Sequence, residues 1–455
     1  MTSATYPRSA IDPEWFYRML AAMLPACLLA YSALIDPLLN INLSAGIEYG
    51  GVIVGSDQKS QTLTKIVVPA FLAIAVLLTF RVPLVIPDRL KLVTAPCAAL
   101  LALAFASFLW AHDPGSTRTF AIYQIILVSV LLLSVCVSGE PDRILRNLLI
   151  MFAIVVGANL AMIVLRPVSD GGQVGIYGFK NTLGGAGGCA LIVGLFHLFS
   201  GKLSWRLLAL FTAAGGIVIT VVSESKAALA LACIAPVGAI VLMGTQRILA
   251  LGPMITGILV LALTLSGVST LALMMGVGLK DALIALYGDT TFTGRTDIWE
   301  FMSGFIQQSP WLGNGYRGFW SLGPESPKHA SEVTFVRITG SGHSGFMDIL
   351  LDLGAIGLGL LLLWMATGFA MIGKYGLRPA ARSLCYMSLF IFLGFRNLLE
   401  SGILWVTHFD SLTFVLVTFL ACYRERGHGQ SQSSTGSVLP PHTHPPQRVT
   451  EGLAR

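Results

Sequence analysis

The sequence has little charge. Asp, Glu, Lys and Arg make up only 11% of its 455 residues, whereas soluble domains average about 25%. Hydrophobic residues make up 55%, and many apolar runs approach the roughly 20 residues that a helix needs to cross about 30 Å of hydrocarbon. This composition excludes a soluble enzyme and a nucleic-acid-binding protein, although Lys and Arg outnumber Asp and Glu by 29 to 23.

The sequence also lacks cysteine spacings typical of metal sites. No two cysteines form a CxxC pair, and all seven lie in or at the ends of apolar runs, so we expect small buried hydrophobic residues and no metal ion or other cofactor. They are Cys27, Cys97, Cys136, Cys189, Cys233, Cys385 and Cys422. A cleavable signal peptide is not expected, because no convincing cleavage site follows the apolar run from Met19 to Ile35.

The apolar runs predict an all-α polytopic membrane protein with about twelve transmembrane helices. One long polar loop separates the ninth span from the tenth. The predicted span centres lie near residues 26, 72, 101, 128, 155, 191, 213, 235, 262, 359, 392 and 413.

Lys and Arg predict the orientation of these spans. With the N-terminus in the cytoplasm, alternate short turns carry the basic residues that favour the cytoplasmic side. These residues are Arg8, Arg18, Arg81, Arg89, Lys91, Arg143, Arg146, Lys202, Arg206, Arg247, Lys374, Arg378, Arg382, Arg424 and Arg426. The opposite face then receives Lys180, Lys226, Arg295, Arg337, His343 and Arg396 from several separate loops. Because the basic turns alone set the orientation, this convergence indicates a site on the outer face.

This topology divides the chain into four segments. They are a membrane domain of about nine spans at 1–276, an outer loop with short helices at 277–345, a membrane domain of about three spans at 346–423 and a tail at 424–455. The tail is rich in Ser, Gln, Pro and His, and we expect it to be disordered in the cytoplasm.

Apolar spacing in the outer loop predicts a helix over Asp297–Ile306. Thr293 or Thr296 is expected to cap its start, and Ser309-Pro310 is expected to end it. The glycines at 313, 315 and 318 then predict an irregular turn beside Tyr316.

Three basic residues of the outer face have two interpretations each. At a helix start, the forked guanidinium of Arg295 suits phosphate oxygens, but a surface Arg could equally cap a loop. Lys226 is either a second phosphate contact or a cation that extends to the membrane surface. Lys180-Asn181, in a glycine-rich stretch, either cradles a headgroup or sugar or caps a span that Gly184 and its neighbours pack closely.

His343 lies just before a span that begins near Phe346. An imidazole there can act as a general base near neutral pH, or it can be a satisfied interfacial side chain. Asp348 and Asp352 enter the outer end of the same helix, four residues apart on one face. Arg396 and Glu400, also four residues apart, predict either functional charges or a structural ion pair.

Taken together, these residues resemble the O-antigen ligase and Wzy polymerase superfamily of bacterial envelope glycosyltransferases. The resemblance covers roughly residues 175–360 by motif and the whole chain by topology. The stretches that carry it are Thr293–Trp299 (GRT with a Trp), Pro310–Tyr316 (PxxGxG), His343-Ser344 with Asp352-Leu353-Gly354, and Ser225-Lys226-Ala227.

Gly178–Asn181 is in turn similar to the HKN turn of ExoQ-type exopolysaccharide polymerases within this superfamily. Two positions depart from the pattern. Ligases more often have Arg where this chain has Lys226, which favours a polymerase. Phe179 stands where the turn often has His, which weighs against a catalytic role for that turn.

The resemblance implies a metal-independent, inverting glycosyltransferase of the bacterial inner membrane, with its active site facing the periplasm. It would polymerise glycan repeat units carried on undecaprenyl diphosphate, for an exopolysaccharide or O-antigen. Arg295 would hold the diphosphate, and His343 would activate or orient the acceptor hydroxyl. The other implied substrate contacts are Lys180, Asn181, Lys226, Tyr316, Arg396 and Glu400.

Two alternatives remain open from the sequence. A ligase would move the finished glycan to lipid A core or another acceptor. A transporter or lipid flippase is less favoured, because most ionisable residues sit at outer helix ends and not near the midplane. The expected partners are the lipid-linked glycan, its acceptor and membrane lipid, with flippase and chain-length regulator proteins as further candidates and no nucleic acid.

Overall fold

The computed structural model describes residues 12–39, 57–165, 172–200, 202–274, 294–375 and 381–423. The predicted tail at 424–455 and the cap candidate Thr293 lie outside these ranges. Every element in the described residues is helical, which confirms the all-α class.

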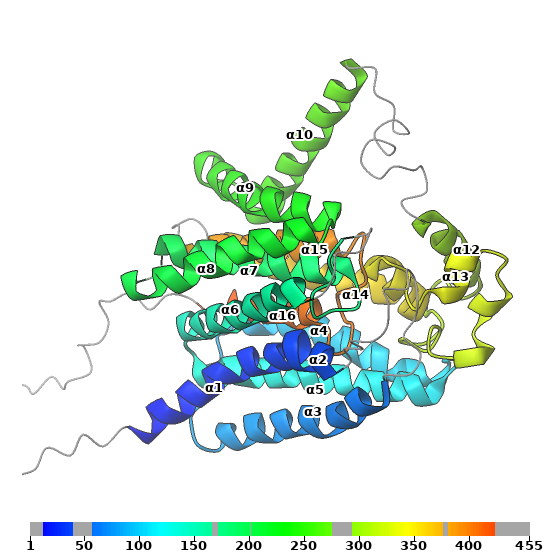
Figure 1. Cartoon of the computed structure of the whole chain (residues 1–455), viewed down its shortest axis with the longest axis horizontal. Helices are drawn as coiled ribbons and strands as arrows, with labels where there is room; N and C mark the ends of the chain where they lie inside the picture. Colours follow the sequence, from blue (N-terminus) through cyan, green and yellow to red (C-terminus); the bar gives the residue numbers. More distant parts are fainter. Residues whose placement is uncertain are drawn as a thin grey trace, which may run out of the picture. The chain divides into compact units, whose positions relative to one another are not determined.

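Most of the helices run side by side in one bundle, whereas α10 extends away from it at the top of the view in Figure 1, and α12 and α13 lie beyond one end, at the right. The helices of the bundle, with α10, are α1 (Pro13–Ala30), α3 (Asp57–Thr79), α4 (Leu90–Ala106), α5 (Pro114–Ser138), α6 (Pro141–Leu165), α7 (Lys180–Ser200), α8 (Leu203–Val222), α9 (Lys226–Leu249), α10 (Pro253–Met274), α14 (Gly345–Tyr375), α15 (Ala381–Arg396) and α16 (Phe409–Leu420). The remaining helices are α2 (Asp36–Leu39), which continues α1 through a π-helical turn, α12 (Arg295–Gln308) and α13 (Thr334–Ile338).

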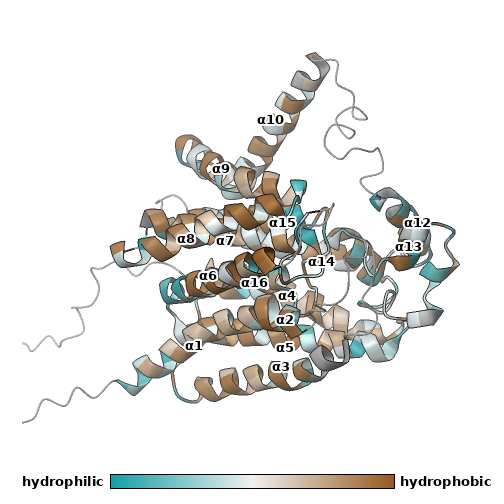
Figure 2. Ribbon diagram, in the orientation of Figure 1, coloured by the Kyte–Doolittle hydropathy of each residue, from teal (hydrophilic) through white to brown (hydrophobic). Residues whose placement is uncertain are grey.

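Nine helices within the described residues are long and apolar enough to cross a membrane, namely α1 with its continuation, α4 to α10 and α14. Figure 2 shows hydrophobic residues along the flanks of the bundle and hydrophilic ones at its ends. All twelve predicted span centres fall within helices. The multi-pass membrane class is therefore confirmed, and the count of twelve spans stays a prediction, because α3, α15 and α16 are shorter or less apolar.

Basic turns and the outer-face residues lie at opposite ends of the bundle. The ion pair Arg382–Asp142 brings together the starts of α6 and α15, and Arg143 pairs with Glu140 at the same start of α6. Since α15 then runs from Arg382 to Arg396, its ends are separated by about 21 Å at 1.5 Å per residue. The basic turns therefore gather away from the end where Arg396 lies.

Glycines allow α7 to approach its neighbours closely. A Cβ at Gly187 would lie 2.7 Å from the carbonyl oxygen of Gly216 in α8, and a Cβ at Gly188 would enter the ring of Phe392 in α15. A Cβ at Gly185 would lie within 2.7 Å of the guanidinium of Arg396. The glycines of this stretch therefore pack closely, and they bring the start of α7 next to the end of α15.

Helix α14 is interrupted at Gly354, whose φ of 64° and ψ of −165° suit only glycine. The interruption exposes backbone groups that bind the loop from Pro310 to Gly315. The Ala355 amide donates to the Pro310 carbonyl at 2.8 Å, and the Gly315 amide donates to the Asp352 carbonyl at 2.9 Å. The loop is thereby fixed against the outer end of α14.

Two local predictions are corrected by the structure. The start of α12 is Arg295, and its N-cap is Gly294 at φ 81°, not a threonine. A left-handed residue at the cap favours glycine, and Thr296 already lies in the first turn; the predicted end at Ser309 is confirmed. Cys27 and Cys233 are exposed on helix surfaces, whereas the other five cysteines are buried as predicted.

Gly354→Ala should strongly destabilise the protein. The new Cβ would collide with the backbone of Trp311, and a non-glycine residue in this conformation costs about 1–3 kcal/mol before the collision is counted. Gly359→Ala, in the same helix with nothing within 4 Å of the added Cβ, is the matched control and should leave stability unchanged or raise it by up to about 1 kcal/mol. Thermal unfolding in detergent measures both; equal melting temperatures would contradict the prediction.

Candidate functional site

The carboxylate of Glu400 joins three segments of the chain. Its Oε1 accepts hydrogen bonds from Nη2 of Arg295 at 2.7 Å and from Nδ2 of Asn181 at 2.6 Å. Its Oε2 lies 3.9 Å from Nδ1 of His343. The starts of α7 and α12 and the turn before α14 therefore meet at one side chain, in the turn between α15 and α16.

Glu400 is held in its ionised form. Burial alone would raise the pKa of its carboxyl, but the neighbouring imidazole of His343 and the charges of Arg396 and Arg295 outweigh burial, and the pKa lies below its ordinary value. The group therefore stays a carboxylate at neutral pH. A carboxylate with a lowered pKa is a weak base, so it is better suited to accept hydrogen bonds than to accept a proton.

Arg396 pairs differently from the prediction. Because α15 ends at Arg396, Glu400 lies beyond the helix and the four-residue spacing no longer sets their geometry. The guanidinium of Arg396 forms its ion pair with Asp410 in α16 and donates to the carbonyl oxygen of Asn181. Only 3% of the surface of Arg396 is exposed, so this side chain is buried in the bundle next to the site. The ion pair of Glu400 is formed with Arg295.

The turn that carries His343 is fixed by two hydrogen bonds to Gly342. His343 has a φ of 48°, a left-handed conformation that is uncommon for a residue other than glycine. Before it, the Gly342 carbonyl accepts a hydrogen bond from the Trp299 indole at 2.8 Å. The Gly342 amide donates to Asp348 at 2.7 Å, and the second oxygen of Asp348 accepts from the hydroxyl of Ser401. Asp348 therefore ties the His343 turn to the residue that follows Glu400.

Three of the predicted cations begin helices. Lys180, Lys226 and Arg295 are the first residues of α7, α9 and α12. A helix start carries partial positive charge and therefore disfavours a cation. The starts of α7 and α9 are in contact, because a Cβ at Gly184 would lie 2.9 Å from the Cβ of Ser225. Positive charge is thus concentrated where α7, α9 and α12 begin.

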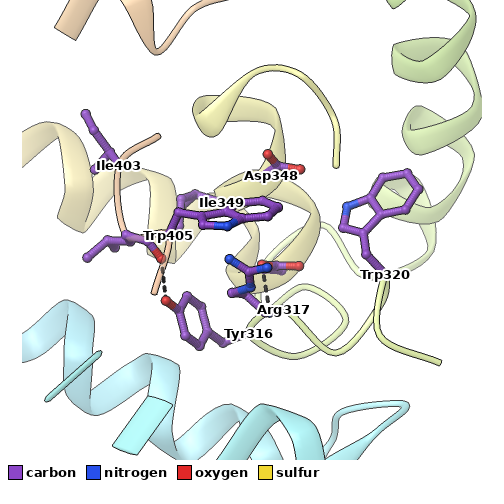
Figure 3. Close-up of a pocket in the computed structure, with 9 residues that line it drawn as sticks. Tyr316, Arg317, Trp320, Asp348, Ile349, Ile403 and Trp405 are labelled. Carbon is purple, nitrogen blue, oxygen red and sulfur yellow. Dashed lines mark hydrogen bonds between the residues drawn. The ribbon is translucent and has the colours of Figure 1, made fainter. Parts of the chain in front are cut away.

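Tyr316, predicted as a substrate contact, is only 1% exposed. Its hydroxyl donates to the carbonyl of Leu404, and its amide donates to Ser107. These contacts favour a structural role beneath the site. Figure 3 shows Tyr316 beside Arg317 and Trp405 at one wall of a cavity.

Sequence reasoning missed Arg317 and Ser401. The Arg317 guanidinium stacks 3.4 Å from the centre of the Trp405 ring, and its amide donates to Asp352 at 2.8 Å. The position of Arg317 within the glycine-rich turn, between Gly315 and Gly318, was the only signal available for it. Ser401 has no sequence signal at all, since its partner Asp348 is 53 residues away.

Within the described ranges, no three His, Cys, Asp or Glu side chains gather closely enough to hold a metal ion. The cluster offers instead cations, one fixed carboxylate and an imidazole. This set can bind an anion and accept a proton.

Comparison with known proteins bears on the same region. Residues 208–362 match the family model described as O-Antigen ligase; this stretch contains Lys226, Arg295 and His343 and ends before Glu400. Over 130 residues the chain is 29% identical to the exopolysaccharide production protein ExoQ of Rhizobium meliloti (strain 1021). That alignment covers 28% of this chain and only 30% of the relative. The match over residues 208–362 confirms the resemblance inferred from the motifs.

Proposed function

We propose that this protein is a glycosyltransferase that polymerises an exopolysaccharide or O-antigen from repeat units carried on undecaprenyl diphosphate. The reaction takes place at the periplasmic face of a bacterial inner membrane. The family match and the name of the ExoQ relative support a role in polysaccharide polymerisation or ligation. Lys226, at a position where ligases more often have Arg, favours the polymerase.

The observation that carries this proposal is the concentration of cations at helix starts beside His343. Lys180, Lys226 and Arg295 together with the ionised Glu400 give a formal charge of +2. Three helix starts add partial positive charge and amide donors. A diphosphate diester carries two negative charges on its two phosphates, so the cluster complements the diphosphate of the donor in charge. Cations in positions that are unfavourable for helix stability are expected where function requires them.

His343 then serves as proton acceptor. The acceptor hydroxyl attacks the anomeric carbon of the donor sugar from the side opposite the diphosphate, so that configuration is inverted. The new carbon–oxygen bond forms as the bond to the diphosphate breaks, and the hydroxyl proton passes to the imidazole. With Nδ1 turned to Glu400, Nε2 is the atom that receives this proton. Glu400 orients the ring and stabilises the imidazolium that results.

Arg295 stabilises the departing diphosphate. Its fork of donors matches phosphate oxygens, and its side chain is 11% exposed, so the charge acts in a partly desolvated place. Arg396 forms its ion pair with Asp410 and does not contact the diphosphate. It positions Asn181, because its guanidinium donates a hydrogen bond to the Asn181 carbonyl. The undecaprenyl chain remains in the lipid around the bundle.

Deletion of the gene should abolish long polysaccharide chains while single repeat units remain on the lipid carrier. The wild-type gene on a plasmid should restore the chain-length distribution. Electrophoretic sizing of extracted polysaccharide measures both. Long chains that accumulate on undecaprenyl diphosphate would instead favour the ligase, and unchanged polysaccharide in the deletion strain would overturn both functions.

Arg295→Lys should lower activity about a hundredfold, because the charge is kept but the two-pronged contact is lost. Arg337→Lys is the matched control, since Arg337 is exposed on α13 and donates to Thr334 of its own helix. The control should retain wild-type activity. Complementation of the deletion strain, with membrane protein levels measured by immunoblot, tests both variants. Full activity of Arg295→Ala would remove Arg295 from the mechanism.

His343→Ala should lose activity by roughly 10² to 10⁴ while donor binding persists. The acid side of the pH profile identifies the group responsible. Because the pKa of Glu400 is lowered, its charge is present above the ordinary carboxyl value of about 4.3 and is lost only below it. A wild-type loss of activity that begins well above pH 4, and is absent from the residual activity of His343→Gln, is expected if His343 accepts the proton. Near-normal activity of His343→Gln would reduce the residue to positioning the hydroxyl.

A further inference from the structure

A small cavity is lined by Asp348, the residue that also binds the His343 turn through the Gly342 amide. It measures about 20 Å³ and is enclosed by the segment Tyr316–Trp320, the outer end of α14 and the turn Ile403–Trp405. Figure 3 shows the indole nitrogen of Trp320 turned toward Arg317 and Asp348. A volume of roughly 10–15 Å³ is sufficient for one water-sized oxygen, so the cavity accommodates a single such atom.

Three buried polar atoms of the lining have no hydrogen-bond partner among the described residues. They are Nη1 of Arg317, Nε1 of Trp320 and Oδ1 of Asp352. Asp352 is 3% exposed, and its other oxygen already accepts the Arg317 amide. An unsatisfied buried group costs about 1–3 kcal/mol, so three in one small space indicate an occupant that satisfies them.

The polarity of these atoms selects the occupant. A cation is repelled by the guanidinium and by the indole N–H. An anion is repelled by Asp348 and Asp352. A hydroxyl oxygen accepts two hydrogen bonds and donates one, which matches two donors and one acceptor.

We propose that this cavity is a subsite for one hydroxyl group of the glycan substrate. The hydroxyl accepts hydrogen bonds from Arg317 and Trp320 and donates one to Asp352. This inference rests on the proposed function, and it adds a residue set that distinguishes between sugars by whether a hydroxyl stands at one ring position.

The surroundings suit a sugar ring. Indole rings of Trp320 and Trp405 line the cavity and offer flat apolar surface beside a polar group. Arg317 is held rigidly, because it stacks on Trp405 and has a left-handed backbone with φ 53°. Asp348 lines the cavity and also binds the Gly342 amide. A sugar seated here is therefore held next to the turn that presents His343.

Trp320→Phe removes the indole donor and keeps an aromatic ring. With the full-length protein in lipid vesicles and a lipid-linked repeat unit as substrate, KM should rise about three- to tenfold, as expected for one hydrogen bond, with kcat within about twofold. Trp364→Phe is the matched control. The indole nitrogen of Trp364 is also buried without a partner in the described residues, but it packs on Phe414 inside the bundle. Its KM should not change.

Substrates that lack one hydroxyl test the same contact without relying on the variant's folding. One deoxy analogue should raise KM by the same factor in the wild type and cause no further rise in Trp320→Phe. An unchanged KM for Trp320→Phe, additive effects with every analogue, or a water that stays in the cavity of a glycan-bound structure would each overturn the subsite. Absence of transfer by the wild-type protein in the same vesicles would instead overturn the proposed function, so the two failures are distinguishable.

Discussion

The ion pair between Arg295 and Glu400 connects the segment outside the bundle to the membrane helices. It depends on a second pair, because Arg396 would compete for Glu400 if Asp410 did not occupy its guanidinium. Breaking a buried pair by removing one partner is strongly destabilising, by about 3–5 kcal/mol. The pairing of α15 with α16 therefore decides which cation the site carboxylate holds. A substitution of Asp410 should thus weaken the ion pair between Arg295 and Glu400, although Asp410 does not pair with Arg295.

Glycine determines where the loops can reach the bundle. At Gly354 the helix opens, and at Gly313 a backbone with φ 67° lies directly against the carbonyl of Asp352. Any side chain at either position would push the loop away from α14. The same approach of backbones places Arg317 over Asp352 and beside Trp405. The glycine motifs of this region therefore act through close backbone contact, and Tyr316 fills the space behind them.

Features set by local sequence were predictable, and features set by distant contacts were not. Hydropathy located the helices, and Ser309-Pro310 marked the end of α12, because apolar periodicity and proline act within a few residues. The convergence of Arg295, His343 and Lys180, the neighbour of Asn181, followed from topology. Their shared partner did not, since Glu400 is 105 residues from Arg295 and 219 from Asn181. The four-residue spacing of Arg396 and Glu400 was misleading, because it presumes a helix that continues to Glu400, whereas α15 ends at Arg396.

Asp348 relates the two halves of the proposed mechanism. One of its oxygens fixes the turn before His343, the other fixes the turn after Glu400, and the residue also lines the cavity proposed for a sugar hydroxyl. Proton transfer requires donor and acceptor within about 3 Å, a tolerance that two independent loops cannot maintain. A side chain that projects from the first turns of a membrane helix is far less mobile than either loop. Because Asp348 in α14 binds both loops, the position of α14 sets the distance from His343 to a bound sugar.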